Sequence, residues 1–394
     1  MTGKQTSLIA AGIAVTLALG ACGSGGGGSG SGNTIKIGAI SSLTGPLQFP
    51  ETRQAAKAVF DDVNAHGGID GKKIRYLVED DKGTPAVAAQ AARRLVDQQG
   101  VVGLVGGTSL ASCAVNARYY DQKDILSVEG AGVLSQCFTS SNISPVNTGP
   151  FSGYTSLLYW ASEVRKRQRV CAILVNVPGL NDGYLAAIER WKKLTGKQLA
   201  GFDNSLGISD DPTPAVAKMK RARCDAVIFN ANEPQVLPVV NAARKQGFYK
   251  GVDWVTLTSA YTVAVAKAVA KAGGAGLFAN SEYEPYTSTS GTIARWRALM
   301  EAHHVPLTSF AEGGYLSALI AVQALKSIKG EVTRESFTKA LHAITDYGNP
   351  LIGSPYSFAP ADAHNPNQSS KFVEVTADGG WKLAEPNWLR LPTG

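Results

Sequence analysis

The sequence predicts an α/β fold with two lobes, each built on a parallel sheet that helices cover on both faces. Three observations predict it: short apolar segments alternate with amphipathic helical segments, this alternation restarts once, and no long linker separates the halves. The chain has 394 residues, enough for two or three domains of roughly 150 residues each. Hydrophobic residues make up 44% of it, which excludes an intrinsically disordered protein.

The first half opens with a strand and a helix. Thr34–Ile40 alternates and is rich in β-branched residues, which predicts a strand. The apolar residues of 56–63 recur at the spacing of one helix face, and Gly67-Gly68 ends that helix. The other elements expected in this half are a strand at Lys73–Glu79, a helix marked by Ala88, Ala91, Ala92, Leu95 and Val96, a strand at Val101–Val105, a helix over about Ser109–Tyr120 and a strand at Ile125–Val128.

The second half repeats this pattern. It opens with a helix whose apolar face includes Leu157, Trp160 and Val164. The expected strands lie at Val170–Val175, near Gln198–Phe202, at Ala226–Phe229 and at Val252–Leu257, and a closing hairpin joins Lys371–Val375 to Trp381–Ala384 across Asp378-Gly379-Gly380. After residue 280 we expect a further pair of long helices, which includes Ala311–Lys326.

Residues 1–22 have the layout of a bacterial export signal. One lysine precedes an uncharged apolar stretch, Leu8–Ala21, that is too short to span a membrane comfortably. The stretch ends in Leu19–Cys22, which is similar to a lipobox, and residues 23–33 follow as a flexible tether composed almost entirely of Gly and Ser. We therefore expect an extracytoplasmic lipoprotein, anchored to the bacterial cell membrane by a lipidated Cys22. A plain signal peptide with an incidental cysteine is the alternative.

Charge and motifs argue against nucleic-acid binding and catalysis. The formal net charge of +7 is spread along the chain, so we expect no nucleic-acid partner. The body of the sequence has no G-x-S-x-G, no P-loop and no G-x-G-x-x-G after a strand. His303-His304 are interpreted as exposed side chains, and Asp80-Asp81 as polar residues that begin a loop. We therefore expect no enzymatic activity, no metal and no cofactor.

Several short segments occur in a characteristic order along the chain. They are Ile37–Pro46 (IGAISSLTGP), Asn64–Ile74 (NAHGGIDGKKI), Glu79-Asp80-Asp81 followed by Pro85, Val102–Ser109 (VGLVGGTS) and His364–Gln368 (HNPNQ). In this order, behind a lipobox, they resemble the type I periplasmic substrate-binding proteins of ABC importers, specifically the leucine/isoleucine/valine-binding group. The resemblance extends over nearly the whole mature chain, about residues 34 to 390.

The resemblance implies two Rossmann-like lobes joined by three crossovers, with the ligand between them and closure by hinge bending. Lobe one is then expected to hold 34–150 plus 279–345, and lobe two 151–278 plus 346–394. The implied function is capture of a small molecule, either an amino acid (branched-chain or other) or a related small carboxylate, by a monomer that delivers it to ABC permease subunits. A ligand-sensing receptor module of the same fold is the alternative, although the chain carries no signalling element.

Four cysteines remain besides Cys22. Outside the cytoplasm an even number favours disulfides, and four cysteines allow three pairings. In a doubly wound unit the first strand lies beside the third, which places Cys171 and Cys224 at the same edge of neighbouring strands. Cys113 lies in the first turn of a helix, and Cys137 lies in the loop after the next strand. We therefore predict the pairs Cys113–Cys137 and Cys171–Cys224, with four free thiols as the alternative.

In open α/β sheets, ligands meet the loops at the carboxyl ends of the strands. The loops that this rule selects are Ser41–Pro46, Gly106–Ser112 and Glu129–Val133 in lobe one, and Val177–Tyr184, Asn230–Glu233 and Thr258–Tyr261 in lobe two. The resemblance implies hydroxyl and amide contacts from lobe one, and aromatic and carboxylate contacts from lobe two. Thr258–Tyr261 lacks the expected carboxylate. Asn232 and Glu233 are therefore candidates in lobe two, where Glu233 either supplies that charge or is a solvated loop residue.

The helix expected to start near Ser109 predicts an anion site. With Ser109 as the N-cap, the amides of Leu110, Ala111 and Ser112 lack intrahelical partners and attract a ligand carboxylate. The hydroxyls of Ser109 and Ser112 are expected to add hydrogen bonds. The residues expected to line the rest of the site are Ala131, Gly132, Val133, Tyr184 and Tyr261. The alternative is that the serines only cap the helix and the tyrosines pack between the lobes.

Overall fold

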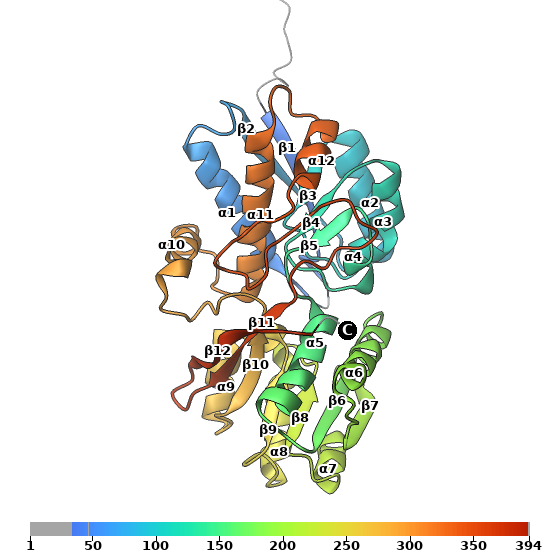
Figure 1. Cartoon of the computed structure of the whole chain (residues 1–394), viewed down its shortest axis with the longest axis vertical. Coiled ribbons are helices and arrows are strands. Elements are labelled where there is room, and N and C mark those ends of the chain that lie inside the picture. Colours follow the sequence, from blue (N-terminus) through green and yellow to red (C-terminus); the bar gives the residue numbers. More distant parts are fainter. Residues whose placement is uncertain (1–33, 46, 393–394) are drawn as a thin grey trace, which may run out of the picture. The chain divides into compact units, whose positions relative to one another are not determined.

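The computed structural model describes residues 34–45 and 47–392 (Figure 1). The predicted signal segment, its tether and the predicted lipidation residue Cys22 lie outside the described residues. Within the described ranges, no helix is both long enough and apolar enough to cross a membrane.

The first sheet is parallel throughout and has the strand order β2-β1-β3-β4-β5. Its strands are β1 (Thr34–Ser41), β2 (Lys73–Asp80), β3 (Gly103–Val105), β4 (Ser127–Glu129) and β5 (Ile143–Pro145). Helices α1 (Pro50–Ala65) and α11 (Ser309–Ser327) pack together on one side of this sheet. Helices α2 (Pro85–Arg93) and α3 (Ser112–Gln122) pack together on the other side (Figure 1).

The second sheet has the strand order β12-β11-β10-β9-β8-β6-β7. Its strands are β6 (Val170–Asn176), β7 (Gly201–Gly207), β8 (Ala226–Phe229), β9 (Asp253–Thr256), β10 (Leu277–Ser281), β11 (Ser369–Val375) and β12 (Trp381–Arg390). The five strands from β10 to β7 are parallel, whereas β11 runs antiparallel to both β10 and β12. The predicted two-lobed α/β fold with parallel sheets is therefore confirmed, with an antiparallel hairpin added to the second sheet.

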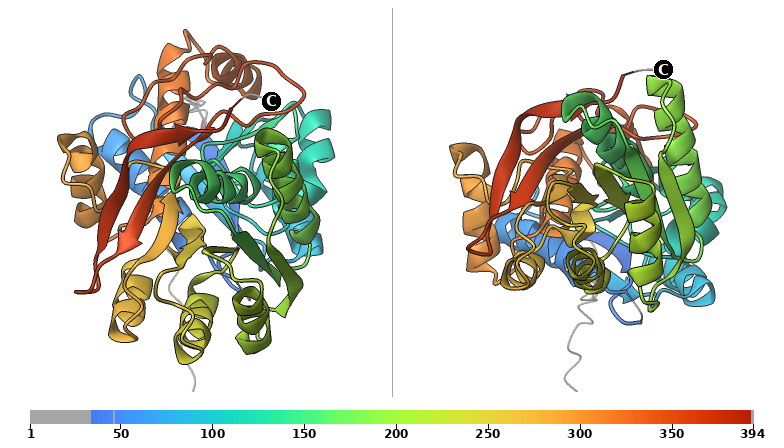
Figure 2. Two further views of the ribbon diagram at one scale, coloured as in Figure 1. Left: turned by 60° about the horizontal axis from the view of Figure 1, so that its bottom comes forward. Right: turned by 90° about the horizontal axis from the view of Figure 1, so that it is seen from below.

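Helices cover both faces of the second sheet (Figure 2). They are α5 (Pro150–Tyr159), α6 (Asn181–Thr195), α7 (Thr213–Arg221), α8 (Glu233–Lys245) and α9 (Val263–Lys271). Val170, Ala172 and Leu174 of β6 share one apolar cluster with α5 and α6. The alternate residues Ile173 and Val175 share the other cluster with α7, α8 and α9. This period of two is how a strand buries both of its faces.

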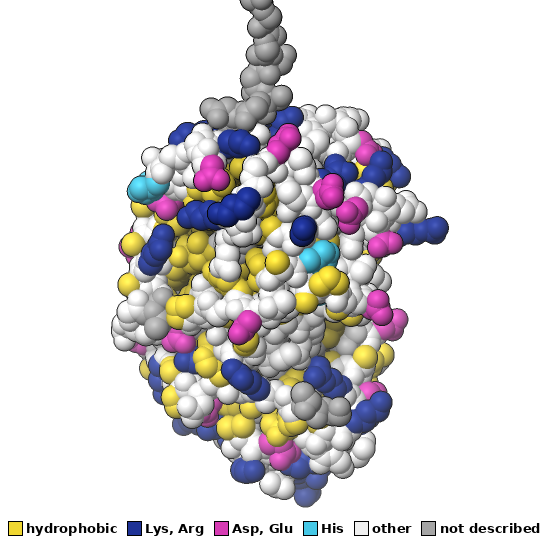
Figure 3. Space-filling model, turned by 45° about the horizontal axis from the view of Figure 1, so that its top comes forward, with side chains coloured by type: hydrophobic (Ala, Val, Ile, Leu, Met, Phe, Trp, Pro, Cys, Tyr) yellow, Lys and Arg dark blue, Asp and Glu magenta, His cyan; other side chains and the backbone are white. Residues whose placement is uncertain are grey.

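Further helical segments connect these elements. They are η1 (Arg94–Gln98), α4 (Ser135–Phe138), η2 (Trp160–Val164), η3 (Thr258–Ala260), η4 (Gly291–Ile293), α10 (Ala294–Ala302) and α12 (Arg334–His342). On the face shown in Figure 3, Lys and Arg side chains are interspersed with Asp and Glu, in keeping with a net charge that is spread along the sequence.

The chain passes between the two sheets three times: after β5, after β10 and after α12. One side chain ties all three segments together, because the Nδ2 atom of Asn367 donates to the carbonyl oxygens of Val146 (3.3 Å) and Glu282 (3.0 Å). The three predicted crossovers are confirmed. The second crossing begins after Ser281, beyond the predicted boundary at residue 279, and the exact extent of each lobe stays a prediction.

Several element boundaries differ from those predicted; among them, β12 continues to Arg390 rather than ending at Ala384. β7 begins at Gly201 rather than near residue 198, and it pairs only with β6 at the edge of the sheet. An edge strand tolerates polar residues such as Asp203, which conceal the apolar alternation. α3 begins at Ser112 rather than near Ser109, because the Ser109 hydroxyl accepts from the following amides and holds a separate turn.

Both predicted disulfides are confirmed. Cys113 and Cys137 join α3 to α4, with their Cα atoms 5.1 Å apart. Cys171 and Cys224 lie 5.9 Å apart at the amino ends of β6 and β8, which are neighbours in the second sheet. The adjacency of first and third strands in a doubly wound unit is therefore enough to choose among the three possible pairings.

Candidate functional site

A cavity of about 70 Å³ lies where loops from the two sheets meet. The residues that line it from the first-sheet side are Leu47, Phe49, Leu110, Gly132, Val133, Asn147 and Phe310. Those that line it from the second-sheet side and the second crossing are Pro150, Leu180, Tyr184, Asn232, Leu257, Thr258, Ser259 and Glu282. The cavity is therefore enclosed by both lobes.

The cavity lies at the carboxyl ends of the parallel strands. Leu110 follows β3, Val133 follows β4, Asn232 follows β8, Thr258 follows β9 and Glu282 follows β10. These are the loop positions at which open α/β sheets bind ligands. Of the residues predicted from the sequence, Leu110, Gly132, Val133, Tyr184 and Asn232 line this cavity.

Glu282 is the charged residue of the described lining, and it is only 4% exposed. Its Oε1 atom accepts from the backbone amide of Gly149 (2.7 Å) and from Nδ2 of Asn147 (3.4 Å). Burial raises the pKa of the Glu282 carboxyl to about 7, although these two hydrogen bonds oppose the increase. Near neutral pH the protonated and ionised forms of this carboxyl are therefore both populated.

The other polar groups of the cavity are neutral. The side-chain amide of Asn147 makes two hydrogen bonds to the backbone of Gly132. Its Oδ1 accepts from the Gly132 N–H (2.8 Å), and its Nδ2 donates to the Gly132 carbonyl oxygen (3.1 Å). The hydroxyl of Thr258 is buried and has no hydrogen-bond partner among the described residues, so it is available to a ligand. Most of the remaining wall is apolar, which is typical of small-molecule sites.

The structure gives the amides of the predicted anion site partners within the protein. Leu110 N donates to the Ser42 hydroxyl (3.1 Å), whereas Ala111 N (3.0 Å) and Ser112 N (2.7 Å) both donate to the Ser109 hydroxyl. The Ser109 hydroxyl in turn donates to the carboxylate of Asp81, which is fully buried. A carboxylate of the protein thus lies against the turn where a ligand carboxylate was expected.

Three further predicted residues lie outside the lining. Ser112 is buried, and its hydroxyl contacts the Tyr120 hydroxyl at 3.1 Å and accepts from Asn116 (3.1 Å). Ala111 and Ala131 are buried and do not line the cavity. The Ser109 hydroxyl thus accepts from the amides at the start of the helix, as in the alternative interpretation in which the serines only cap it, although the N-cap residue of α3 is Ala111 and Ser112 lies inside the helix.

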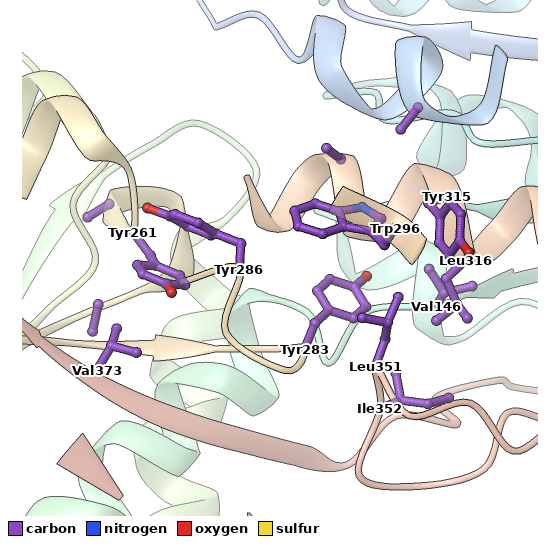
Figure 4. Packing of buried hydrophobic residues seen from close by; sticks show 14 of the residues in the cluster. Val146, Tyr261, Tyr283, Tyr286, Trp296, Tyr315, Leu316, Leu351, Ile352 and Val373 are labelled. Carbon is purple, nitrogen blue, oxygen red and sulfur yellow. The ribbon is translucent and has the colours of Figure 1, made fainter. Parts of the chain in front are cut away.

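The two predicted tyrosines have different surroundings. Tyr184 lines the cavity and packs edge-on against Phe151 and Tyr154. Tyr261 is fully buried, stacks on Tyr286 with ring centroids 4.2 Å apart (Figure 4), and its hydroxyl contacts Thr287 at 2.8 Å. Tyr184 can therefore touch a ligand, whereas Tyr261 supports the segment behind the cavity.

Asn232 and Glu233 also have different surroundings. Asn232 is the N-cap of α8, and its backbone amide donates to the side chain of Gln235 (2.8 Å). Glu233 is exposed, and its carboxylate accepts from the Thr262 hydroxyl (2.8 Å) outside the cavity lining. The negative charge that reaches the cavity is that of Glu282 rather than Glu233.

Glu282 and Asn147 are residues that the sequence analysis missed. Glu282 directly follows β10, a strand that was not predicted because Asn280 and Ser281 interrupt its apolar run. The strand-end rule would have selected Glu282 had this strand been recognised. Asn147 lies just after β5, a three-residue strand that ends in Pro145 and gives almost no periodic signal.

A second cavity, of about 220 Å³, lies on the other side of the first crossing. Residues Thr148, Phe151 and Arg190 are among those that line it, and they belong mainly to the crossing and to α5 and α6. It is larger than the first cavity, but its lining lies on helix sides rather than at the carboxyl ends of strands. The strand-end position therefore favours the smaller cavity as the functional site.

The chain is similar to known binding proteins over most of its length. Residues 34–380 match the family described as periplasmic binding protein. The Leu/Ile/Val-binding protein of Escherichia coli (strain K12) is 25% identical over 219 residues, which cover 54% of this chain and 59% of that protein. The chain thus aligns with only about three fifths of the length of this curated relative.

Two solved structures show the same fold. The branched-chain amino acid transporter substrate-binding protein of Streptococcus pneumoniae, in complex with isoleucine, has a TM-score of 0.73 at 19% identity and covers 90% of this chain and 100% of its own. An ABC transporter solute-binding protein from R. palustris, in complex with 4-hydroxybenzoate, has a TM-score of 0.72 at 18% identity and covers 91% and 98%. Because the family match spans most of the sequence and these structures share its two-lobed fold, the chain belongs to the periplasmic binding protein family.

Proposed function

We propose that this protein is an extracytoplasmic solute-binding lipoprotein that captures a small molecule between its lobes and delivers it to an ABC permease. The observation that carries the proposal is the cavity at the strand ends, which residues from both sheets line. A ligand held there contacts both lobes at once, so its binding energy favours the closed arrangement over the open one.

The relatives support a small, largely apolar ligand. Those compared above are named for leucine, isoleucine and valine, or were solved with isoleucine or 4-hydroxybenzoate. Leu47, Phe49, Val133, Leu180 and Phe310 give the cavity of this chain a comparable apolar wall. We therefore place its ligand among amino acids and related small molecules with an aliphatic or aromatic body.

A ligand screen tests this function. The purified protein is heated in the presence of amino acids, aromatic acids, amines and short amides, and hits are titrated by calorimetry. A ligand present at about 100 times its dissociation constant adds about 2.7 kcal/mol to the free energy of unfolding, which appears as a higher melting temperature. Stoichiometric binding by at least one of these molecules supports the proposal, and the absence of any binding contradicts it.

Membrane anchoring is tested separately from ligand binding. Labelling of cells with a radioactive fatty acid is expected to mark the wild-type protein and not the Cys22→Ser variant. Recovery of unlabelled wild-type protein from the soluble fraction, with a mature terminus other than Cys22, would show that the lipidation prediction is wrong.

A further inference from the structure

One carboxyl oxygen of Glu282 accepts hydrogen bonds from the protein, and the other does not. Both of its hydrogen bonds, from the Gly149 amide and from Asn147, end on Oε1. Oε2 accepts no hydrogen bond from any described residue, although Glu282 lines the cavity and is nearly buried. Because the Glu282 side chain is nearly buried, a carboxylate oxygen without a donor is unfavourable there, and a donor on a ligand stabilises it.

The backbone and side chains around Glu282 hold this carboxyl in place. Asn147 couples it to the Gly132 loop, Gly149 belongs to the first crossing, and Asn367 of the third crossing donates to the Glu282 carbonyl oxygen. All three crossings therefore fix the position of one acceptor. Such an acceptor loses little conformational entropy when a ligand binds.

The cavity favours a positive group over a negative one. Its described lining contains no Lys, Arg or His. The amides of Leu110, Ala111 and Ser112, which could otherwise bind an anion, already donate within the protein. A carboxylate placed in this cavity would lose its hydration without gaining a cation, and it would lie in the field of Glu282.

We infer that the ligand presents a protonated nitrogen to Oε2 of Glu282, with its apolar body against the aliphatic and aromatic wall, and that it needs no carboxylate. The substrate class is that of apolar primary amines, and an apolar amino acid binds through its ammonium group rather than its carboxylate. This inference rests on the proposed function, because it specifies the chemistry of the same cavity. The unpartnered Thr258 hydroxyl supplies a second, neutral contact.

Protonation provides an independent readout. Burial raises the pKa of Glu282 to about 7 in the protein without ligand, whereas an alkylamine stays charged up to a pKa near that of lysine, about 10. Only the ionised carboxylate pairs with the ammonium group, so binding is expected to tighten about tenfold per pH unit below pH 7 and to level off above it. Binding at pH 7 then releases about half a proton per ligand, because about half of the carboxyls are protonated at that pH, and calorimetry detects this release as a heat that depends on the buffer.

The experiment uses three probes that share one alkyl body: leucine, 3-methylbutylamine, which lacks the carboxylate, and 4-methylpentanoate, which lacks the ammonium group. Benzylamine and benzoate form a matching aromatic pair. Calorimetric titration of the full chain is expected to show 3-methylbutylamine or benzylamine binding at least as tightly as leucine. The two carboxylates are expected to bind about tenfold or more weakly.

Variants assign the preference to one residue. Glu282→Gln keeps the shape and the Oε1 acceptor, and it is expected to weaken amine binding about tenfold or more and to abolish both the pH dependence and the proton release. Glu301→Gln, which removes an exposed carboxylate on α10, serves as the control and is expected to bind as the wild type does. The melting temperature without ligand shows whether each variant is folded.

Two results contradict the inference while leaving the proposed function intact: a carboxylate probe that binds more tightly than its amine partner, or Glu282→Gln protein that binds the amine with wild-type affinity and pH dependence. If no amine, acid or amino acid binds at all, the proposed function itself fails.

Discussion

Near the cavity, the partners of each buried carboxyl determine which of them is available to a ligand. Asp81 is fully buried and accepts hydrogen bonds from the hydroxyls of Ser42 and Ser109. Glu129 is 5% exposed and accepts from the Ser127 hydroxyl at 2.7 Å. Glu282 alone of these three lines the cavity. Asp81 and Glu129 therefore act on the stability of the first lobe, whereas Glu282 acts on the ligand.

Ser109→Ala separates the capping interpretation from direct ligand contact. The substitution removes the acceptor of the Ala111 and Ser112 amides and one donor to Asp81. The free energy of unfolding is expected to fall by about 1–3 kcal/mol in urea denaturation, with less than about a threefold change in ligand affinity. Ser209→Ala, in the exposed turn after β7, is the control. A large loss of affinity with unchanged stability would place the ligand at Ser109 instead.

Glu129 predicts a pH dependence of stability. Burial raises the pKa of its carboxyl from 4.5 to about 7, so between these values the folded protein binds a proton that the unfolded chain has lost. The free energy of unfolding therefore falls as pH rises from about 4.5 to 7, by about 3 kcal/mol, and changes little above that. Glu129→Gln is expected to reduce this fall in urea denaturation at pH 5 and pH 8, while the contribution of Glu282 persists. An unchanged difference between the two pH values would refute this assignment.

At the scale of elements, the strands with a regular apolar pattern could be predicted from the sequence. β1, β6 and β8 are apolar and regular, and their positions agree with the predicted strands within about two residues. β5 and β10 were not predicted, because a terminal proline shortens one and buried polar residues interrupt the other. These two strands precede the first and second crossings, so the residues that join the lobes were the hardest to recognise from sequence.

The two disulfides are expected to differ in their effect on binding. The Cys113–Cys137 disulfide lies beside the cavity. Gly132 lines the cavity, and a Cβ atom added to Gly132 would lie 3.0 Å from the Cβ of Cys137. Cys171–Cys224 lies at the amino ends of its strands, away from the cavity. Replacing either pair by serines is expected to lower the free energy of unfolding by about 2–4 kcal/mol. Only the Cys113→Ser/Cys137→Ser variant is expected to lose ligand affinity, and equal affinity losses in both double variants would contradict this difference.

Asn367→Ala tests the connection among the crossings. The variant loses the donors to the carbonyl oxygens of Val146 and Glu282, both of which are in buried surroundings. The free energy of unfolding is expected to fall by about 1–3 kcal/mol, and ligand affinity is expected to fall with it because Glu282 is less well positioned. Asn387→Ala on β12, where the side chain is exposed, provides the comparison. If both variants melt and bind alike, Asn367 does not hold the crossings.

At the scale of the molecule, the sequence selected several of the loops that line the cavity but not the charged residue in its lining. The strand-end rule correctly selected loops that line the cavity, including those of Val133 and Asn232. The charge of the site was not predictable, because Glu282 reaches the cavity only through the second crossing, whose path depends on how the two sheets are connected. Likewise, the turn at Ser109 has the sequence of an anion site, and only the hydrogen bonds from its amides to the Ser42 and Ser109 hydroxyls show that these amides are occupied.

The central claim is that a small molecule binds in the cavity between the lobes, and Val133→Trp tests it most directly. Val133 lines the cavity and is partly exposed, so an indole there fills the ligand's space with little disturbance of the fold. Calorimetry with the tightest ligand of the screen is expected to show one site in the wild type and an affinity loss of about a hundredfold or more in the variant, at a similar melting temperature. Wild-type affinity in Val133→Trp protein would contradict the account, because the ligand would then bind elsewhere.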